Sequence, residues 1–232
     1  MKLAIVGCGL MGSGVATLVS PDAQLLLIDR ESDKARRLAE TRGAAWSGDL
    51  SAAADAEVIA VVVPAAAVES AFCELAGVAG PGAIILDMAT KGTIPERLKT
   101  ERPDIRFTEA KIVGSAVGVQ AGLKALLVVD IDDPGELRAL RNAFPGFAGV
   151  VAGDTKRVAQ VNNRGTYYGI RAAVETEAYV RGLGLPEEWA KCASGCLAPG
   201  VAAGFSSGQM GKFAREIAEQ IEEELRAEKR NN

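Results

Sequence analysis

Histidine is absent from the 232-residue chain, and its absence excludes many common kinds of catalytic site. No Ser-His-Asp or Cys-His arrangement can form, and a histidine general base is excluded. Zinc and non-haem iron sites built on imidazole are excluded as well, and we predict no metal site. Acid–base chemistry in this chain must therefore use lysine, tyrosine, a carboxyl group, a thiol or water.

Cysteines and long apolar runs are scarce. The longest apolar runs have about seven or eight residues, whereas a membrane-spanning helix needs roughly 20, so we expect no membrane partner. The net charge of −4 argues against nucleic acid as a partner. Because no secretion signal is evident, we expect a cytoplasmic protein with reduced thiols, most of them small buried side chains. The four cysteines are Cys8, Cys73, Cys192 and Cys196.

Apolar strand-like runs alternate with helical patterns over the first 150 residues. Glu57–Val63 is a continuous, mostly β-branched run, typical of a strand buried on both faces. Such alternation indicates βαβ units and a mostly parallel sheet. We predict an α/β fold, a Rossmann-type doubly wound parallel sheet followed by a small all-helical C-terminal domain. The other predicted strands are Leu3–Val6, Leu25–Ile28, Ala83–Leu86, Leu126–Ile131 and Val150–Ala152.

The pattern changes near Gly153, where strand signals end. Residues 155–182 are long enough for a single helix of roughly 42 Å at 1.5 Å per residue, and two further helical stretches follow. We therefore predict two domains, residues 1–153 and 154–232. The second is small for independent stability, so we expect a homodimer formed through the C-terminal helices.

A glycine-rich loop follows the first predicted strand directly. Gly7-Cys8-Gly9-Leu10-Met11-Gly12 is a G-x-G-x-x-G sequence between a strand and a helix, the context that gives this motif its meaning. The first glycine permits the tight turn, the second lets the backbone approach a pyrophosphate, and the third lets the helix pack closely. The helix N-terminus favours an anion. We predict that a dinucleotide contacts Gly7, Gly9, Leu10, Met11 and Gly12.

Asp29 ends the second predicted strand, 22 residues after Gly7. This spacing is near that of a carboxylate that accepts hydrogen bonds from the adenosine ribose. A carboxylate there repels a 2′-phosphate and favours NAD, but the adjacent Arg30 can hold a 2′-phosphate, so NADP stays possible. Alternatively, Asp29 only caps the helix that begins near Ser32.

Two further strand ends carry candidate cofactor contacts. Val63 and Pro64 end one strand, and Thr90 follows another. Ligands in open α/β sheets lie outside the carboxyl ends of the strands, so we predict that these three residues contact the cofactor. Ordinary strand-to-helix turns are the alternative.

The motifs resemble those of the β-hydroxyacid dehydrogenases, the group that contains 3-hydroxyisobutyrate dehydrogenase and 6-phosphogluconate dehydrogenase. The glycine loop matches their G-x-G-x-M-G pattern, and Asp87 and Thr90 match a D-x-S-T-x-x-P stretch. Residues 109–129 occupy the place of the substrate segment, and residues 153–165 are similar to the start of the interdomain helix. The resemblance covers roughly residues 1–180 and implies a nicotinamide cofactor and hydride transfer.

The substrate segment departs from the family pattern. Val113 stands where the family has serine, and Gly114 and Ser115 follow it. We predict that Gly114 and Ser115 contact the substrate, with the Ser115 hydroxyl replacing the missing one. Lys111 is a weaker candidate for an anionic substrate group, because a single lysine at a strand edge is usually solvated.

The interdomain helix departs from the pattern as well. Counting back from Asn162-Asn163 places Ala159 at the position of the family's catalytic lysine, whereas counting forward from Gly153 places Arg157 nearest. No lysine therefore aligns with that position.

A polar stripe on this helix supplies other candidates. Lys156, Gln160, Asn163 and Tyr167 are spaced to lie on one helical face. We predict that Lys156 is the acid/base, that Asn163 orients the substrate, and that Tyr167 is a reserve proton donor. Gln160 is a predicted substrate contact. Alternatively, Lys156 is a solvated residue of the first turn and the amides bridge helices.

We therefore predict an NAD(P)-dependent oxidoreductase that transfers a hydride between a nicotinamide cofactor and a small hydroxy acid or related carbonyl compound. An imine reductase-like or prephenate dehydrogenase-like enzyme is one alternative. A dinucleotide-binding protein without catalysis is another, because Val113 and Ala159 stand at the usual substrate and lysine positions. The sequence leaves open the substrate, the choice between NAD and NADP, and the proton donor.

Overall fold

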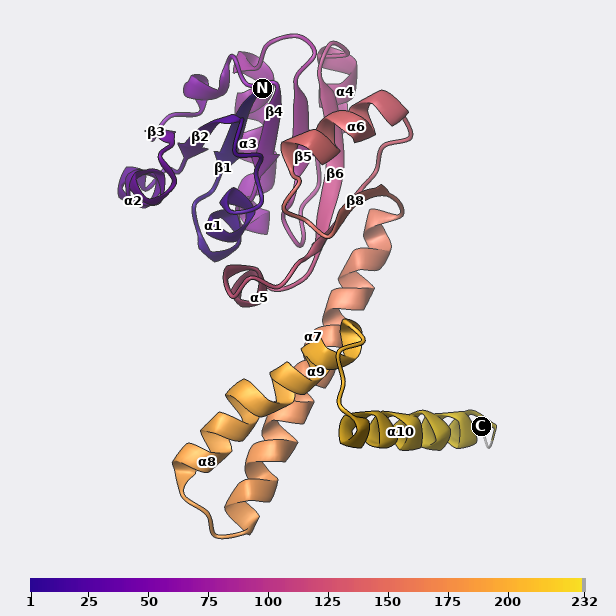
Figure 1. The fold of residues 1–232 in the computed structure, drawn as a ribbon. Coiled ribbons are helices and arrows are strands. Elements are labelled where there is room, and N and C mark those ends of the chain that lie inside the picture. Colours follow the sequence, from indigo (N-terminus) through magenta and orange to yellow (C-terminus); the bar gives the residue numbers. More distant parts are fainter. Residues whose placement is uncertain (231–232) are drawn as a thin grey trace. The chain divides into compact units, whose positions relative to one another are not determined.

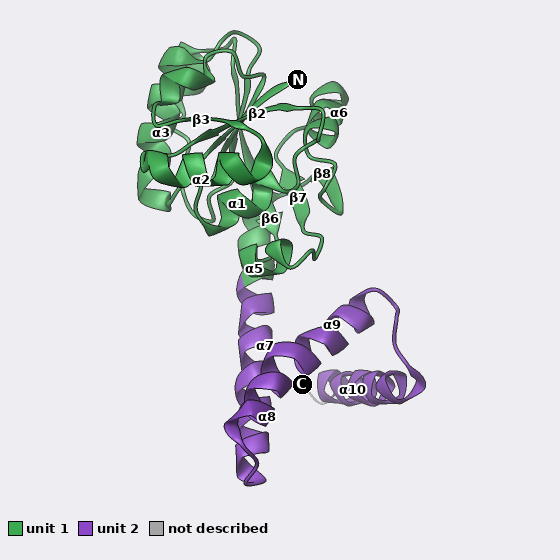
Figure 2. Cartoon of the chain, turned by 60° about the vertical axis from the view of Figure 1, so that its left-hand side comes forward, with its two compact units in different colours: residues 1–162 green, residues 163–232 purple. Residues whose placement is uncertain are grey.

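The computed structural model describes residues 1–230, so the last two residues of the predicted domain 154–232 lie outside the described residues. The chain forms two compact units, residues 1–162 and the residues from Asn163 onward (Figure 2). The first unit is built on an eight-stranded sheet in the order β3-β2-β1-β4-β5-β6-β7-β8 (Figure 1). The strands are β1 (Lys2–Val6), β2 (Gln24–Ile28), β3 (Ala45–Ser47), β4 (Val58–Val61), β5 (Ile84–Asp87), β6 (Arg106–Val113), β7 (Leu126–Val129) and β8 (Gly149–Ala152).

The sheet is parallel except between β6 and β7, which pair in antiparallel fashion. This architecture confirms the predicted α/β class and the Rossmann-type sheet. The first unit also contains the helices α1 (Leu10–Ala16), α2 (Ser32–Arg42), η1 (Leu50–Ala53), α3 (Ala65–Val78), α4 (Arg97–Glu101), α5 (Ala116–Gln120) and α6 (Pro134–Ala143).

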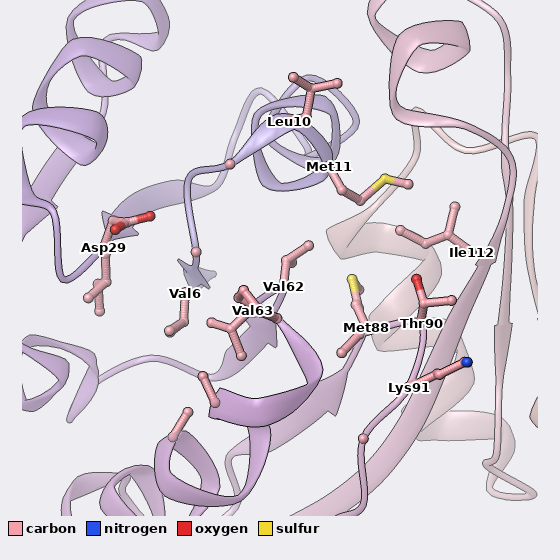
Figure 3. Close-up of a pocket in the computed structure, with 18 of the residues that line it drawn as sticks. Val6, Leu10, Met11, Asp29, Val62, Val63, Met88, Thr90, Lys91 and Ile112 are labelled. Atoms are coloured by element: carbon pink, nitrogen blue, oxygen red, sulfur yellow. The ribbon is translucent and has the colours of Figure 1, made fainter.

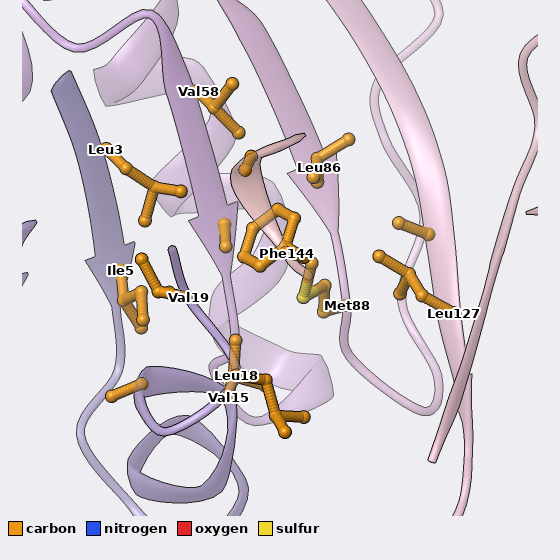
Figure 4. Close-up of a cluster of buried hydrophobic side chains, with 14 of the residues drawn as sticks. Leu3, Ile5, Val15, Leu18, Val19, Val58, Leu86, Met88, Leu127 and Phe144 are labelled. Carbon is orange, nitrogen blue, oxygen red and sulfur yellow. The ribbon is translucent and has the colours of Figure 1, made fainter. Parts of the chain in front are cut away.

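The core lies on both faces of the sheet because successive strand residues point to opposite sides. In β1, Leu3 and Ile5 join one apolar cluster, which includes Phe144 beside α6 (Figure 4). Ala4 and Val6 join the second cluster, against α3. The apolar runs that predict the strands are therefore the residues that fill the two cores.

Two strands, β3 and β6, are missing from the sequence prediction. The segment that forms β6 contains Glu109 and Lys111, and these charges interrupt the apolar pattern that reveals the other strands. The strand can still be buried because Lys111 pairs with Asp87 on the neighbouring strand β5. β3 is only three residues long, at the sheet edge, and has no continuous apolar run.

Helix α7 (Thr155–Gly182) begins beside the predicted domain boundary at Gly153. The first compact unit nevertheless extends to Asn162. Thr155 and Val158 are buried, and the side-chain amide of Asn162 donates a hydrogen bond to the carbonyl of Ile112 at 2.8 Å. The first two turns of α7 are therefore part of the sheet unit.

The second unit is helical, as predicted. It contains the rest of α7, α8 (Glu187–Cys192), η2 (Ala193–Leu197), α9 (Ala198–Ser206) and α10 (Lys212–Arg230). Arg181 forms ion pairs with Glu177 and Glu187, both at 2.7 Å, and so links the end of α7 to the start of α8. Cys192 and Cys196 are exposed and Cys8 is the one buried cysteine among the described residues, so the expectation that most of the cysteines are buried is wrong. Among residues 1–230, none of the helices combines the length and hydropathy needed to cross a bilayer.

Candidate functional site

A cavity of about 930 Å³ lies in the first unit, at the carboxyl ends of the parallel strands (Figure 3). Open α/β sheets bind their ligands at this position. Asp29 lies on one side of the cavity and Thr90 and Lys91 on the other, with Val62 and Val63 between them (Figure 3). The predicted site residues that line the cavity are Gly7, Gly9, Leu10, Met11, Asp29, Arg30, Val63, Pro64, Thr90, Gly114 and Lys156.

The three glycines of the loop have different surroundings. Gly7 has a φ of +99°, and a Cβ added there would lie 2.4 Å from the carbonyl oxygen of Val62. A Cβ on Gly12 would lie 1.8 Å from the carbonyl oxygen of Gly7, whereas one on Gly9 would meet nothing within 4 Å. Gly7 and Gly12 therefore shape the strand–helix turn, and the space beside Gly9 is open to a ligand.

The Asp29 carboxylate is fixed against the glycine loop. Its Oδ2 accepts a hydrogen bond from the backbone N–H of Cys8 at 2.7 Å, and its Oδ1 accepts one from the backbone N–H of Glu31 at 2.8 Å. Glu31, not Asp29, occupies the cap position of α2, and its side chain makes no capping hydrogen bond. Asp29 thus orders the turn before α2 and still lines the cavity. Arg30 beside it is exposed and also lines the cavity.

Cys8 is buried within the glycine loop. Its Sγ lies 3.7 Å from the carbonyl oxygen of Ile28. Burial, and secondarily the negative charge of Asp29, raises the pKa of the Cys8 thiol to about 12. At neutral pH this thiol is protonated. It is too weak an acid to serve as the proton donor in place of histidine.

A buried ion pair stands at the ends of β5 and β6. The Nζ of Lys111 donates to Asp87 Oδ2 at 2.6 Å, to the carbonyl oxygen of Ala89 at 2.8 Å and to that of Asp87 at 3.3 Å. Asp87 is fully buried and Lys111 is 9% exposed, so the expectation of a solvated lysine is wrong. A lysine inside an apolar strand, beside an acid that ends the neighbouring strand, is the sequence signal that indicates this pair.

A second polar contact joins β6 to α7 at the same end of the cavity. The Thr155 hydroxyl donates a hydrogen bond to Glu109 Oε2 at 2.6 Å, and both residues line the cavity. Glu109 and Lys111 lie two residues apart on β6 and therefore on the same face of the sheet. Neither Glu109 nor Thr155 is among the predicted site residues, because the predicted strands do not include β6, which carries Glu109.

The cavity meets a different face of α7 from the predicted one. Thr155, Ala159 and Asn162 line it, and of the predicted stripe only Lys156 does. Gln160 is exposed and lies outside the lining; Asn163 and Tyr167 are exposed and belong to the second unit. The packing of Thr155 and Val158 into the first unit fixes the rotation of the helix, and this rotation turns Asn162, rather than Asn163, towards the cavity.

The substrate segment is divided in a similar way. Gly114 lines the cavity, but Ser115 does not. The Ser115 hydroxyl accepts a hydrogen bond from the N–H of Gly118 at 3.0 Å and caps the short helix α5. The structure therefore gives the Ser115 hydroxyl a local structural role.

Comparison with known families identifies the first unit. Residues 2–129 match the family described as the NAD binding domain of 6-phosphogluconate dehydrogenase. The chain belongs to this family. The membership confirms the resemblance to the β-hydroxyacid dehydrogenases and the assignment to NAD(P)-binding dehydrogenases and reductases, with NAD as cofactor and NADP possible. A search of curated proteins gave no match.

Solved structures of similar fold include several oxidoreductases. A putative oxidoreductase from Mycobacterium avium 104 is 26% identical, with a TM-score of 0.63 over 81% of this chain and 70% of that chain. A pyrroline-5-carboxylate reductase from Coxiella burnetii is 13% identical, with a TM-score of 0.74 over 99% and 90%. The 3-hydroxyisobutyrate dehydrogenase of Mycobacterium tuberculosis is 20% identical, with a TM-score of 0.61 over 84% and 70%.

Proposed function

We propose that this chain catalyses hydride transfer between NAD(H) and a small anionic hydroxy acid or related carbonyl compound. The observation that carries the proposal is the cavity that extends from Asp29, past the glycine loop, to the polar residues at the ends of β5 and β6. Asp29 suits the ribose of the adenosine half, and the space at Gly9 suits the pyrophosphate. The opposite end then takes the nicotinamide and the substrate.

The charges at that end favour an anionic substrate. Lys111 is already neutralised by Asp87. Lys91 and Lys156 line the cavity and have no ionic partner within residues 1–230. Two unpaired ammonium groups attract a carboxylate, and they outweigh the single negative charge of Glu109.

The protein's own groups would then bind, orient and protonate the substrate. The bound cofactor supplies or accepts the hydride. We assign Lys156 as the acid/base, because it is the one residue of the predicted stripe in the lining. Asn162 takes the orienting role predicted for Asn163: its Nδ2 is held by Ile112, and its Oδ1 accepts no hydrogen bond from residues 1–230, so that oxygen can accept one from a substrate hydroxyl.

Imine reduction is the second candidate. Ala159 lines the cavity and, counted back from Asn162-Asn163, stands at the position of the family's catalytic lysine, so a carbonyl substrate would meet a methyl group there. An imine of ordinary basicity arrives already protonated and needs less help from a protein acid. The whole-chain similarity to a pyrroline-5-carboxylate reductase is a likeness of fold and is compatible with this candidate.

A substrate panel tests both candidates. Purified protein is incubated with NADH or NADPH and a series of 2-oxo acids, 3-oxo acids and cyclic imines, and cofactor absorbance is followed. The proposal expects turnover of oxo acids and, in reverse, of the matching hydroxy acids. Turnover of imines alone would favour the second candidate, and tight cofactor binding without turnover of any compound would overturn both in favour of a dinucleotide-binding protein.

We also propose that the chain forms a homodimer through its C-terminal helices and acts in the cytoplasm. In α10, Phe213, Ile217, Ile221 and Leu225 recur every four residues and so share one helical face, and all four are exposed. Exposed apolar faces of this kind mark interaction surfaces. Four cysteines without a disulfide within the described residues suit a reducing compartment.

A further inference from the structure

The segment after β5 presents two residues to the nicotinamide end of the cavity. Thr90 and Lys91 are exposed and line the cavity, while Ala89 before them is buried. Lys91 is a cation that the proposed function uses. What fixes this short segment therefore decides how that end of the cavity is shaped.

The segment is held at two points. At Ala89, the backbone N–H donates to Asp87 Oδ1 at 3.0 Å and the carbonyl oxygen accepts from Lys111 at 2.8 Å, so both polar groups of this residue are bound by the ion pair. At Gly92, the backbone lies so close to α3 that an added Cβ would come within 2.7 Å of a Val68 methyl group. Thr90 and Lys91 stand between these two anchors.

Lys111 has no hydrogen-bond donor left for a ligand. An ammonium group has three donors, and the structure gives this one three acceptors, two carbonyl oxygens and the Asp87 carboxylate. A buried ion pair is also a poor source of stability, because desolvating two charges offsets most of their attraction. The pair is therefore better explained by what it holds in place than by the stability it adds.

We propose that Lys111 is a positioning residue for the nicotinamide half of the cofactor: together with Asp87 it fixes Ala89, so that Thr90 and Lys91 form a rigid wall of the cavity. The inference rests on the proposed function, since it takes the cavity to be a dinucleotide site. Lys111 acts through the backbone of the 88–92 segment and touches neither the adenosine end nor the glycine loop. Its loss should therefore weaken only the binding that depends on the nicotinamide.

The test compares two ligands that differ in the nicotinamide. Binding of NADH and of ADP-ribose, which lacks that ring, is measured by calorimetry for the wild type and Lys111→Met. We expect NADH affinity to fall about tenfold or more, which corresponds to the free energy of the charge-assisted hydrogen bond that holds Ala89 in place, and ADP-ribose affinity to change by less than about twofold. If NADPH binds the wild type more tightly, NADPH and 2′-phospho-ADP-ribose replace the pair.

Two further variants keep the test decisive. Lys111→Met leaves the Asp87 carboxylate buried without a partner, so the double variant Asp87→Asn/Lys111→Met removes both charges and keeps an oxygen for the Ala89 N–H. Lys99→Met is the matched control: this exposed lysine on α4 lies outside the cofactor cavity and pairs with Glu96 at 3.1 Å. The double variant should repeat the selective loss of NADH affinity, and Lys99→Met should bind both ligands as the wild type does.

Three outcomes would overturn the positioning role: equal losses for both ligands in a folded variant, no loss for either, or failure of both Lys111 variants to fold. Failure of the wild type to bind ADP-ribose is a separate result, because it would overturn the proposed function itself.

Discussion

Gly9 and Gly12 stand three residues apart in the glycine motif, Gly9 at the cap of α1 and Gly12 within it, yet an added side chain would meet open space at Gly9 and the backbone at Gly12. A Cβ at Gly12 would lie 1.8 Å from the Gly7 carbonyl oxygen, and one at Gly9 would meet no atom within 4 Å. We therefore expect Gly12→Ala to lower the thermal unfolding midpoint by several degrees, as a destabilisation of roughly 1–3 kcal/mol does. Gly9→Ala should unfold like the wild type. Differential scanning fluorimetry measures both, and equal midpoints would contradict the packing assigned to Gly12.

Cys8 provides a prediction on reactivity with pH. Its pKa of about 12, against an ordinary value of 9.0, leaves about one molecule in a thousand ionised at pH 9, where an ordinary thiol is half ionised. Because the thiolate is the reactive form, iodoacetamide should modify the exposed Cys192 and Cys196 well before Cys8. Mass spectrometry of peptides after timed labelling checks the order. Labelling of Cys8 at the rate of Cys196 would show that the loop is open.

The same shift affects stability only in alkaline solution. The folded chain holds the Cys8 proton more tightly than the unfolded chain does, so the contribution is fully present below pH 9 and is lost as the pH rises towards 12. Cys8→Ser replaces the thiol by a hydroxyl of similar shape that does not ionise between pH 9 and 12. The unfolding midpoint of this variant should therefore fall less over that interval than that of the wild type.

At the scale of the element, α7 distinguishes what the sequence can predict from what it cannot. The carboxyl ends of apolar strands are visible in a sequence, and Gly9, Asp29 and Thr90, which the sequence predicts at such ends, line the cavity. The rotation of a helix about its axis depends on which residues pack, and of the polar stripe predicted on α7 only Lys156 lines the cavity. β6 was missed for a related reason, because the partner that neutralises Lys111 lies 24 residues earlier in the chain, at Asp87.

The adjacent asparagines of α7 test this placement. Asn162 is half-buried, lines the cavity and binds the Ile112 carbonyl, whereas Asn163 is exposed. We expect Asn162→Ala to lower kcat/KM on the identified substrate by about tenfold or more, with Asn163→Ala as the matched control close to the wild type. Steady-state kinetics of the two variants shows whether Asn162 or Asn163 orients the substrate. The reverse order would restore the original assignment of Asn163.

At the scale of the whole molecule, the two units have different kinds of surface. The sheet unit buries its apolar residues in two clusters, whereas the helical unit leaves many exposed, including Tyr179, Trp189 and Phe213. A chain with this much exposed apolar surface in one unit is expected to associate. The sequence predicts these helices, but a single sequence does not show which partner packs against their apolar faces.

The exposed apolar face of α10, formed by Phe213, Ile217, Ile221 and Leu225, leads to a prediction about the oligomeric state. Ile217→Glu/Ile221→Glu places two charges on the apolar face, and we expect the homodimer to dissociate into monomers because buried carboxylates in an apolar interface are costly. Light scattering after size-exclusion chromatography measures the mass. Glu219→Gln, on the same helix, is the control and should leave the mass unchanged. A wild type that is already monomeric would contradict the proposed dimer.

The central claim is that the glycine loop and Asp29 hold a nicotinamide dinucleotide at the carboxyl ends of the strands. A titration of NADH, followed by the fluorescence of the reduced nicotinamide, tests it most directly when the wild type is compared with Gly9→Trp. A Cβ added at Gly9 meets no atom within 4 Å, so we expect the variant to fold and its indole to occupy the space proposed for the pyrophosphate. Saturable binding by the wild type and none by Gly9→Trp is the predicted result, and equal NADH affinity in the two proteins would contradict the account.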